Sequence, residues 1–306
     1  MASRPGLPIE AIEKKTMSIA DSGKPEPAEG WAEVRALRMR YLDWGGDGPP
    51  VLALHGLASS AHWYDILAPF LCGRFRVVAP DQRGHGRTTQ AADGYDWHSV
   101  ASDAAGLLDV LGIERAIVLG HSWGGNVAVA TAAHFPDRVR ALVMIDGGFV
   151  GPEMIPGGTW EDFSRRLAPR DVSGTRAQFL RRMAGQLAGC WNGEVERIVQ
   201  TMVYERDGQI YDILRPENQA QVIRAMWEDP SSEAWPRIEC PTLIVPAGAS
   251  PQEAESQFAL ARRRLVDLAA DAIPDCRVHW IADTIHDIGY HKPEELARAI
   301  IAFIEG

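Results

Sequence analysis

A serine between two glycines follows a buried-looking apolar run and precedes a helix-forming segment. The pattern is Gly-x-Ser-x-Gly at Gly120, Ser122 and Gly124, and residues 116–119 before it are all apolar. A sharp turn from strand to helix would strain the serine and expose its hydroxyl, and glycines are needed where a Cβ would meet backbone. N–H groups at the helix start would favour an oxyanion formed by attack of that hydroxyl. We therefore predict that Ser122 is a nucleophile.

A serine nucleophile needs a base, because a hydroxyl is a weak nucleophile until its proton is taken during attack. His286 follows the last strand-like run and precedes the helix-forming segment that begins at Pro293. His279 lies inside that run and His291 lies beside the helix start, so we interpret both as packing or surface residues. The sequence thus predicts His286 as the base for Ser122.

The elements that must position these two residues alternate between β-type runs and helical patterns, which is typical of a parallel sheet. Runs 51–54 and 116–119 are apolar at every position, as in strands buried on both faces. An antiparallel edge strand is expected over Glu33–Trp44. The other expected strands are Val51–His55, Phe75–Pro80, Ala116–Gly120, Val139–Asp146, Thr242–Ala247 and Arg277–Ile281. The expected helices are Ala61–Leu71, Ser99–Leu111, Ser122–His134, Ala254–Leu268 and Pro293–Ile304.

The alternation stops once, over residues 150–237, where amphipathic patterns replace the strand signals. We predict a helical cap there, inserted after the sixth strand between the two parts of a core domain, 32–149 and 238–306. An insertion at the carboxyl end of a strand is well placed to cover the crevice where open α/β sheets bind ligands. Residues 1–31 are rich in Pro, Gly, Ala and charge, so we expect a flexible leader.

Composition argues against several classes of protein. The 31 basic and 41 acidic residues give a net charge of -10, which repels phosphate backbones and anionic membranes. We therefore expect no nucleic-acid or membrane partner, and no apolar run is long enough to predict a spanning helix. The four cysteines lack CxxC spacing, so neither a metal site nor a disulfide framework is predicted. The expectation is a cytoplasmic monomer or homodimer with no cofactor and a small-molecule substrate.

These features resemble the α/β-hydrolase superfamily over about residues 33–306. Besides the serine motif, residues 54–57 resemble the superfamily's His-Gly turn after the third strand, and the histidine loop before the last helix is also similar. The resemblance implies a mostly parallel, eight-stranded sheet flanked by helices. By the same match, the backbone N–H groups of Leu57 and Trp123 form the oxyanion hole.

A second turn also resembles the superfamily. The segment that contains Asp81, Arg83 and His85 is similar to its D-x-R-G-H-G turn, for which the resemblance implies a structural role.

The third catalytic residue departs from the superfamily's usual pattern. Its acid normally lies in a G-x-x-D turn, but Pro251 occupies that position here. Some members take the acid from the end of the strand after the nucleophile helix, where Asp146 stands. Glu253, two residues after the proline, is the alternative. Both keep the chain order serine, acid, histidine, and we favour Asp146.

The superfamily includes enzymes with different activities, and the nucleophile argues against some of them for this chain. Haloalkane dehalogenases and the related epoxide hydrolases use aspartate where Ser122 stands, which argues against both activities. The oxyanion turn lacks the H-G-G-P-G pattern of proline iminopeptidases, and Trp123 stands where perhydrolases generally have methionine. Hydrolysis of a carboxylic ester, thioester or lactone without metal or cofactor is the prediction. A ligand receptor, a lyase or an acyltransferase on the same scaffold is the alternative.

Aromatic residues in the predicted cap and oxyanion-side helix could form an apolar pocket for an acyl or aromatic group. Each of them could instead belong to the core. The candidates for substrate contact are Trp63, Trp160, Trp191, Tyr204 and Trp227.

Overall fold

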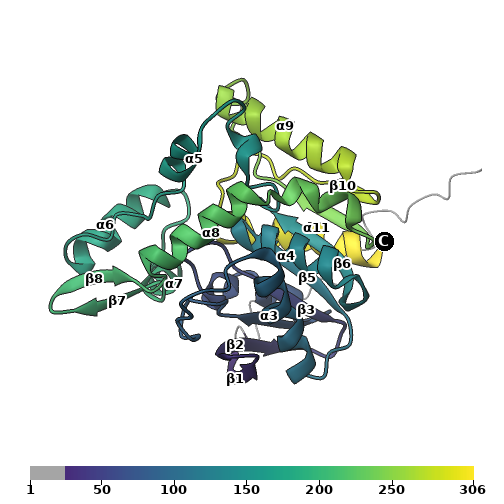
Figure 1. Cartoon of the computed structure of the whole chain (residues 1–306), viewed down its shortest axis with the longest axis horizontal. Coiled ribbons are helices and arrows are strands. Elements are labelled where there is room, and N and C mark those ends of the chain that lie inside the picture. Colours follow the sequence, from purple (N-terminus) through teal and green to yellow (C-terminus); the bar gives the residue numbers. More distant parts are fainter. Residues whose placement is uncertain (1–24) are drawn as a thin grey trace, which may run out of the picture.

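A computed structural model describes residues 25–306; residues 1–24, most of the predicted leader, lie outside the described part of the chain. Its centre is an eight-stranded sheet in the order β1-β2-β4-β3-β5-β6-β9-β10 (Figure 1). The strands β1 and β2 are antiparallel to each other, β2 is antiparallel to β4, and the remaining pairs are parallel. The predicted mostly parallel sheet of eight strands is confirmed. Its strands are β1 (Ala28–Val34), β2 (Leu37–Gly45), β3 (Pro50–Leu54), β4 (Arg76–Pro80), β5 (Ala116–His121), β6 (Val139–Ile145), β9 (Thr242–Val245) and β10 (Cys276–Val278).

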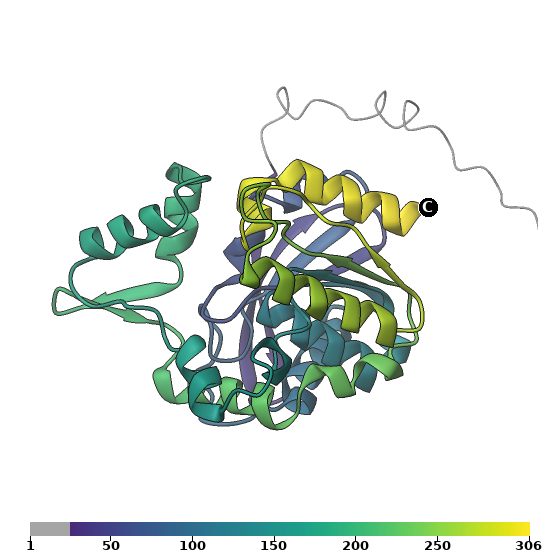
Figure 2. The ribbon, with the colours of Figure 1, turned by 90° about the horizontal axis from the view of Figure 1, so that it is seen from above.

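Successive residues of the central strands belong to two separate apolar clusters, one on each face of the sheet. Leu52 and Val118 pack with α3 (Trp97–Val110), α4 (Trp123–His134) and α9 (Gln257–Ala272). Val51 and Ile117 pack instead with α2 (Ala68–Leu71) and α11 (Pro293–Glu305). The helices therefore form layers on both sides of the sheet, which Figure 2 shows from above. A strand covered on both faces must be apolar throughout, and this explains the continuous apolar runs in the sequence.

The inserted segment, which is the predicted cap, contains four α-helices. They are α5 (Trp160–Arg166), α6 (Arg176–Gln186), α7 (Gly193–Gln200) and α8 (Pro216–Glu228). The segment also contains a hairpin of β7 (Val203–Arg206) and β8 (Gln209–Asp212), which was not predicted from the sequence. The hairpin turns at Asp207 and Gly208, both at positive φ (53° and 73°). Aspartate followed by glycine is a strong signal for such a two-residue turn. Figure 2 shows α6 and the hairpin to one side of the core.

The structure corrects three other boundaries. The strand β1 begins at Ala28, so the last residues assigned to the leader belong to the sheet. The helix predicted over Ala61–Leu71 is a 3₁₀ turn, Ala61–Tyr64, followed by the single turn of α2. The last strand is shorter than predicted, and a single bridge between Ala247 and Ile281 continues its pairing.

Two polar contacts join α7 and the residue after it to the segment that follows the predicted oxyanion turn. Arg197 of α7 lies 2.9 Å from a carboxylate oxygen of Asp65. The hydroxyls of Thr201 and Ser60 are 2.7 Å apart. The inserted segment therefore contacts the rest of the chain beside the carboxyl ends of β3 and β4, at the edge where the predicted site residues gather.

Candidate active site

Ser122 lies at the turn between β5 and α4. Its backbone has φ 54° and ψ −124°, a conformation that residues other than glycine rarely adopt. Its N–H donates to the carbonyl of Ile145 (3.0 Å), and its own carbonyl accepts from Gly125 N–H (2.9 Å). A Cβ on Gly120 would lie 2.1 Å from a backbone oxygen of Gly124. The corner is therefore tight on both sides of Ser122, which is the local geometry expected from the serine motif.

Asp146 directly follows β6, and its carboxylate is hydrogen-bonded to His286. Oδ2 lies 2.6 Å from Nδ1 of His286, and Oδ1 accepts the Ala247 N–H at 3.0 Å. The guanidinium of Arg262, in α9, donates to both carboxylate oxygens. The Asp146 side chain is 1% exposed, whereas that of His286 is 45% exposed. The structure thus brings two of the predicted site residues together, one buried and one open to solvent.

The electrostatics of this pair favour an ionised aspartate. Burial alone would raise the pKa of Asp146, but the hydrogen bond and charge of His286, together with Arg262, outweigh burial and lower it. Desolvation of the inner part of the ring would lower the pKa of His286, but the hydrogen bond and charge of Asp146 raise it above its ordinary value. The imidazole is therefore better able to hold an added proton than an isolated histidine would be.

His121, the residue before Ser122, contacts the loop that carries His286. The ring centroids of His121 and His286 are 4.7 Å apart, and His121 Nε2 lies 3.1 Å from the backbone oxygen of His286. A Cβ on Gly147, next to Asp146, would lie 2.1 Å from the backbone oxygen of Ser122. In the described part of the chain, no hydrogen bond joins the serine hydroxyl to the imidazole. Such bonds often tighten only when substrate is bound.

The loop that carries His286 packs against a pair of stacked aromatic rings. The rings of Trp63 and His121 lie parallel, with centroids 4.1 Å apart, and the indole N–H of Trp63 donates to Asp287 at 2.8 Å. Burial lowers the pKa of His121 to about 4, so this ring is neutral near pH 7. A neutral His121 can therefore donate a hydrogen bond from Nε2 to the backbone of His286.

The predicted oxyanion turn lies next to Ser122 and is held by a second histidine. Ala58 has a positive φ of 53°, and its N–H donates to Nε2 of His85 at 3.1 Å. Burial lowers the pKa of His85 to about 3, so the ring stays neutral and can accept this bond. Among the described residues, the N–H groups of Leu57 and Trp123 have no protein acceptor. Both groups are therefore available to a ligand.

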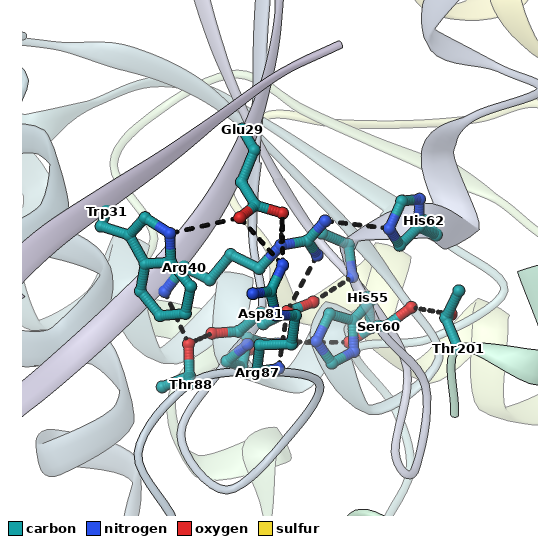
Figure 3. A network of polar contacts seen from close by, with 12 residues as sticks. Glu29, Trp31, Arg40, His55, Ser60, His62, Asp81, Arg87, Thr88 and Thr201 are labelled. Atoms are coloured by element: carbon teal, nitrogen blue, oxygen red, sulfur yellow. Dashed lines mark hydrogen bonds and ion pairs between the residues drawn. The ribbon is translucent and has the colours of Figure 1, made fainter. Parts of the chain in front are cut away.

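The turn after β4 is built from buried ion pairs and hydrogen bonds. Asp81 is fully buried, lies 3.0 Å from Arg40, and accepts the backbone N–H groups of Ala61 and Arg87 (Figure 3). Arg83 likewise pairs with the buried carboxylate of Asp103. Asp81 and Arg83 are therefore each paired within the protein, and their structural role stays a prediction.

Glu253, the alternative acid, has a different hydrogen-bond partner. It is exposed and accepts a hydrogen bond from the hydroxyl of Ser250 at 2.9 Å. No hydrogen bond or ion pair joins Glu253 to His286 in the structure of residues 25–306.

The aromatic candidates for substrate contact have varied surroundings. Trp63 is 1% exposed and packs in the core beside the loop that carries His286, a position that argues against contact with substrate. Tyr204 is exposed and stacks on Tyr211 of the hairpin. Trp160 and Trp227 pack against one another between α5 and α8, with centroids 6.1 Å apart, and Trp191 is half-buried. The fate of an aromatic side chain depends on tertiary packing, which its position in the sequence does not reveal.

A small cavity of about 80 Å³ opens beside the Asp146–His286 pair. The side chains around it are mostly apolar, but two guanidinium groups also reach it. Its lining includes Phe149, Val150, Met154, Arg166, Phe258 and Arg262.

Residues 25–306 lack the features required for a metal-binding cluster and for a membrane-spanning helix. No cluster of His, Cys, Asp or Glu in this range has the geometry to hold a metal ion. No helix in the range has the length and apolar character needed to cross a membrane.

Comparison with known proteins agrees with this geometry. A family model described as the alpha/beta hydrolase fold matches residues 49–196. The chain belongs to the α/β-hydrolase superfamily. It is 29% identical to 2-(acetamidomethylene)succinate hydrolase of Mesorhizobium japonicum, over 85% of this chain and 89% of that enzyme. It is 24% identical to epoxide hydrolase A of Mycobacterium tuberculosis, over 92% of this chain and 98% of that enzyme.

The solved structures support the same class. The crystal structure of E-2-(acetamidomethylene)succinate hydrolase superposes with a TM-score of 0.73 at 26% identity, covering 92% of this chain and all of that one. At this level, the chain is a hydrolase of the α/β fold.

Proposed function

We propose that this superfamily member is a serine hydrolase that cleaves a carboxylic ester or lactone of a small, largely apolar substrate. The observation that carries the proposal is the strained serine corner beside the Asp146–His286 pair. Ser122 has the backbone conformation of an exposed nucleophile, and the imidazole near it is hydrogen-bonded through Nδ1 to a buried carboxylate. That bond fixes the tautomer with its proton on Nδ1 and leaves Nε2 to accept a proton.

The proposed cycle has two halves. The hydroxyl oxygen of Ser122 attacks the carbonyl carbon while its proton passes to Nε2 of His286, and the carbonyl electrons move onto oxygen. The N–H groups of Leu57 and Trp123 are free to donate to this oxyanion. The electrons return, the bond to the leaving oxygen breaks, and His286 gives that oxygen its proton. Water then repeats the sequence on the acyl-enzyme and releases the acid and free Ser122.

The assignment of Asp146 as the acid has support from its contacts. It is the carboxylate hydrogen-bonded to His286, while Glu253 is exposed and engaged with Ser250. An imidazolium forms during each half of the cycle, and a buried, ionised carboxylate at 2.6 Å would stabilise it.

The nature of the nucleophile separates this proposal from one of the relatives. Epoxide hydrolases of the superfamily resemble this chain in fold, but their aspartate nucleophile is replaced here by Ser122. The name of the other relative specifies a substrate with an acetamido group. We therefore include an N-acetyl compound among the test substrates, beside esters and lactones.

The test is a panel of p-nitrophenyl esters of graded acyl length, together with γ- and δ-lactones and an N-acetyl enamine. Each is assayed with the wild type and with Ser122→Ala as the blank. We expect turnover of at least one ester or lactone that falls to the blank rate in the variant. Equal rates for the two proteins would refute the serine mechanism.

A second measurement separates hydrolysis from the alternative activities. With water labelled at oxygen, hydrolysis places the label in the acid product, whereas acyl transfer or elimination does not. Ligand-dependent binding of a partner without turnover would favour a receptor.

A further inference from the structure

Arg262 contacts the acid of the candidate site directly, although it lies on a helix that provides no predicted catalytic residue. Its Nη1 donates to Oδ1 of Asp146 at 2.9 Å and to Oδ2 at 2.8 Å, and it lies 3.4 Å from the carbonyl of Ala247. The side chain is 18% exposed, and its guanidinium lies over the ring of Phe258 at 4.9 Å. Packing on Phe258 therefore restricts where the cation can lie.

This contact gives one buried carboxylate two partners that can carry positive charge. Oδ2 accepts from both His286 and Arg262, and Oδ1 accepts from Ala247 N–H and Arg262. A carboxylate that is 1% exposed is costly to ionise without compensation. The imidazole compensates it only when protonated, whereas a guanidinium is charged at every accessible pH. Arg262 thus compensates the negative charge of Asp146 at every pH, whether or not His286 is protonated.

We propose that Arg262 is a positioning residue that keeps Asp146 ionised and aimed at His286, and that limits how strongly Asp146 attracts the proton of the imidazole. The proposal rests on the proposed function, in which Asp146 and His286 act as acid and base. It goes further because it assigns a fourth side chain to the site and gives that residue control over the basicity of His286.

The titratable and charged groups around His286 come from several parts of the fold. Asp146 after β6 and Asp287 in its own loop favour the imidazolium, and Arg262 in α9 opposes it. His121 at the end of β5 is neutral because burial lowers its pKa to about 4. Arg166 at the end of α5 lines the same small cavity as His286 but is exposed. Among residues 25–306, Arg262 is the arginine that is hydrogen-bonded to Asp146, so removing its charge should strengthen the attraction between Asp146 and the imidazolium and raise the pKa of His286.

The experiment compares Arg262→Met with Arg262→Lys and with Arg264→Met. Met removes the charge and keeps much of the side-chain volume, and Lys keeps the charge. Arg264 is an exposed arginine of the same helix, so it gives a matched control for the same substitution. The titration of His286 is followed by NMR in the Ser122→Ala background, with His286→Gln to assign its signal. Because nothing turns over in this readout, it is independent of the proposed hydrolytic activity.

We expect Arg262→Met to raise the pKa of His286 by about 1 unit, while Lys and the control leave it near the wild-type value. In proteins with Ser122 intact, the acid limb of kcat/KM should move upward by the same amount. On the plateau, kcat should fall about 10-fold with little change in KM, because misplacement of the acid affects the chemical step.

Two results would overturn the proposal. One is an unchanged His286 titration in a folded Arg262→Met protein. The other is an equal upward shift in Arg262→Lys, which would show that charge is not the cause. If the Met variant does not fold, Arg262→Gln carries the same expectation, because it is uncharged and can still donate to Asp146. An inactive wild type would refute the proposed function and leave the NMR test intact.

Discussion

Replacing Asp146 with asparagine tests the hydrogen-bond pattern of the site. In the wild type, Oδ1 accepts the Ala247 N–H and Oδ2 accepts from His286 Nδ1, while Arg262 donates to both. The fixed backbone donor of Ala247 requires an acceptor at Oδ1, so the asparagine oxygen should take that position. Its NH₂ group then faces His286 and donates to Nδ1, which forces the proton onto Nε2.

An imidazole with its proton on Nε2 cannot take a proton from Ser122. Loss of the correct tautomer in a serine triad lowers kcat on the order of 10⁴-fold, which corresponds to about 5.5 kcal/mol of transition-state stabilisation. The assay is kcat for the best ester of the panel, measured for Asp146→Asn and for the control Glu253→Gln. Glu253 is exposed and its carboxylate accepts from the hydroxyl of Ser250, so its variant should stay within about 2-fold of wild type.

The reasoning fails if Asp146→Asn keeps wild-type activity while Glu253→Gln is inactive, since the acid would then be the other carboxylate. It also fails if both variants are active, because no buried carboxylate would then be needed to orient His286. Near-ultraviolet circular dichroism of each variant checks that the fold is unchanged.

Three further predictions follow from the structure. Because Asp146 raises the pKa of His286 above its ordinary 6.5, kcat/KM should rise with pH through an apparent pKa above 6.5; a limb below that value contradicts the pairing. Trp63→Phe should lower the free energy of unfolding by about 2 kcal/mol through loss of the bond to Asp287, without changing the preference between short and long acyl esters; a changed preference would mean that the indole contacts substrate. Asp81→Asn leaves the buried cation of Arg40 without its ion-pair partner in the turn, and urea unfolding should show a loss of about 3 kcal/mol; an unchanged midpoint would argue against a structural role.

The sheet could be predicted from the sequence because its central strands are buried on both faces. That environment leaves continuous apolar runs, and turns between strand and helix leave the glycines and the serine in a fixed pattern. The two-residue turn of the β7–β8 hairpin also left a signal, Asp207-Gly208, but the short strands beside it resemble segments of an amphipathic helix.

The surroundings of the site could not be predicted in the same way, because its contacts join distant residues. Trp63 and Asp287 are 224 positions apart, and Arg262 and Asp146 are 116 apart. Residues 262–264 are three consecutive arginines, and which of them reaches the acid depends on how α9 is rotated against the sheet. The buried position of Trp63 likewise follows from its stack with a histidine on a neighbouring strand end.

The central claim is that Ser122 is the nucleophile, and covalent labelling tests it most directly. The protein is treated with a fluorophosphonate, its intact mass is measured, and the modified peptide is sequenced by mass spectrometry. We expect wild type to gain one phosphonyl group on Ser122 as activity is lost, and Ser122→Ala to gain none. Labelling of the variant to the same extent, or modification of the wild type at another residue, would contradict the account.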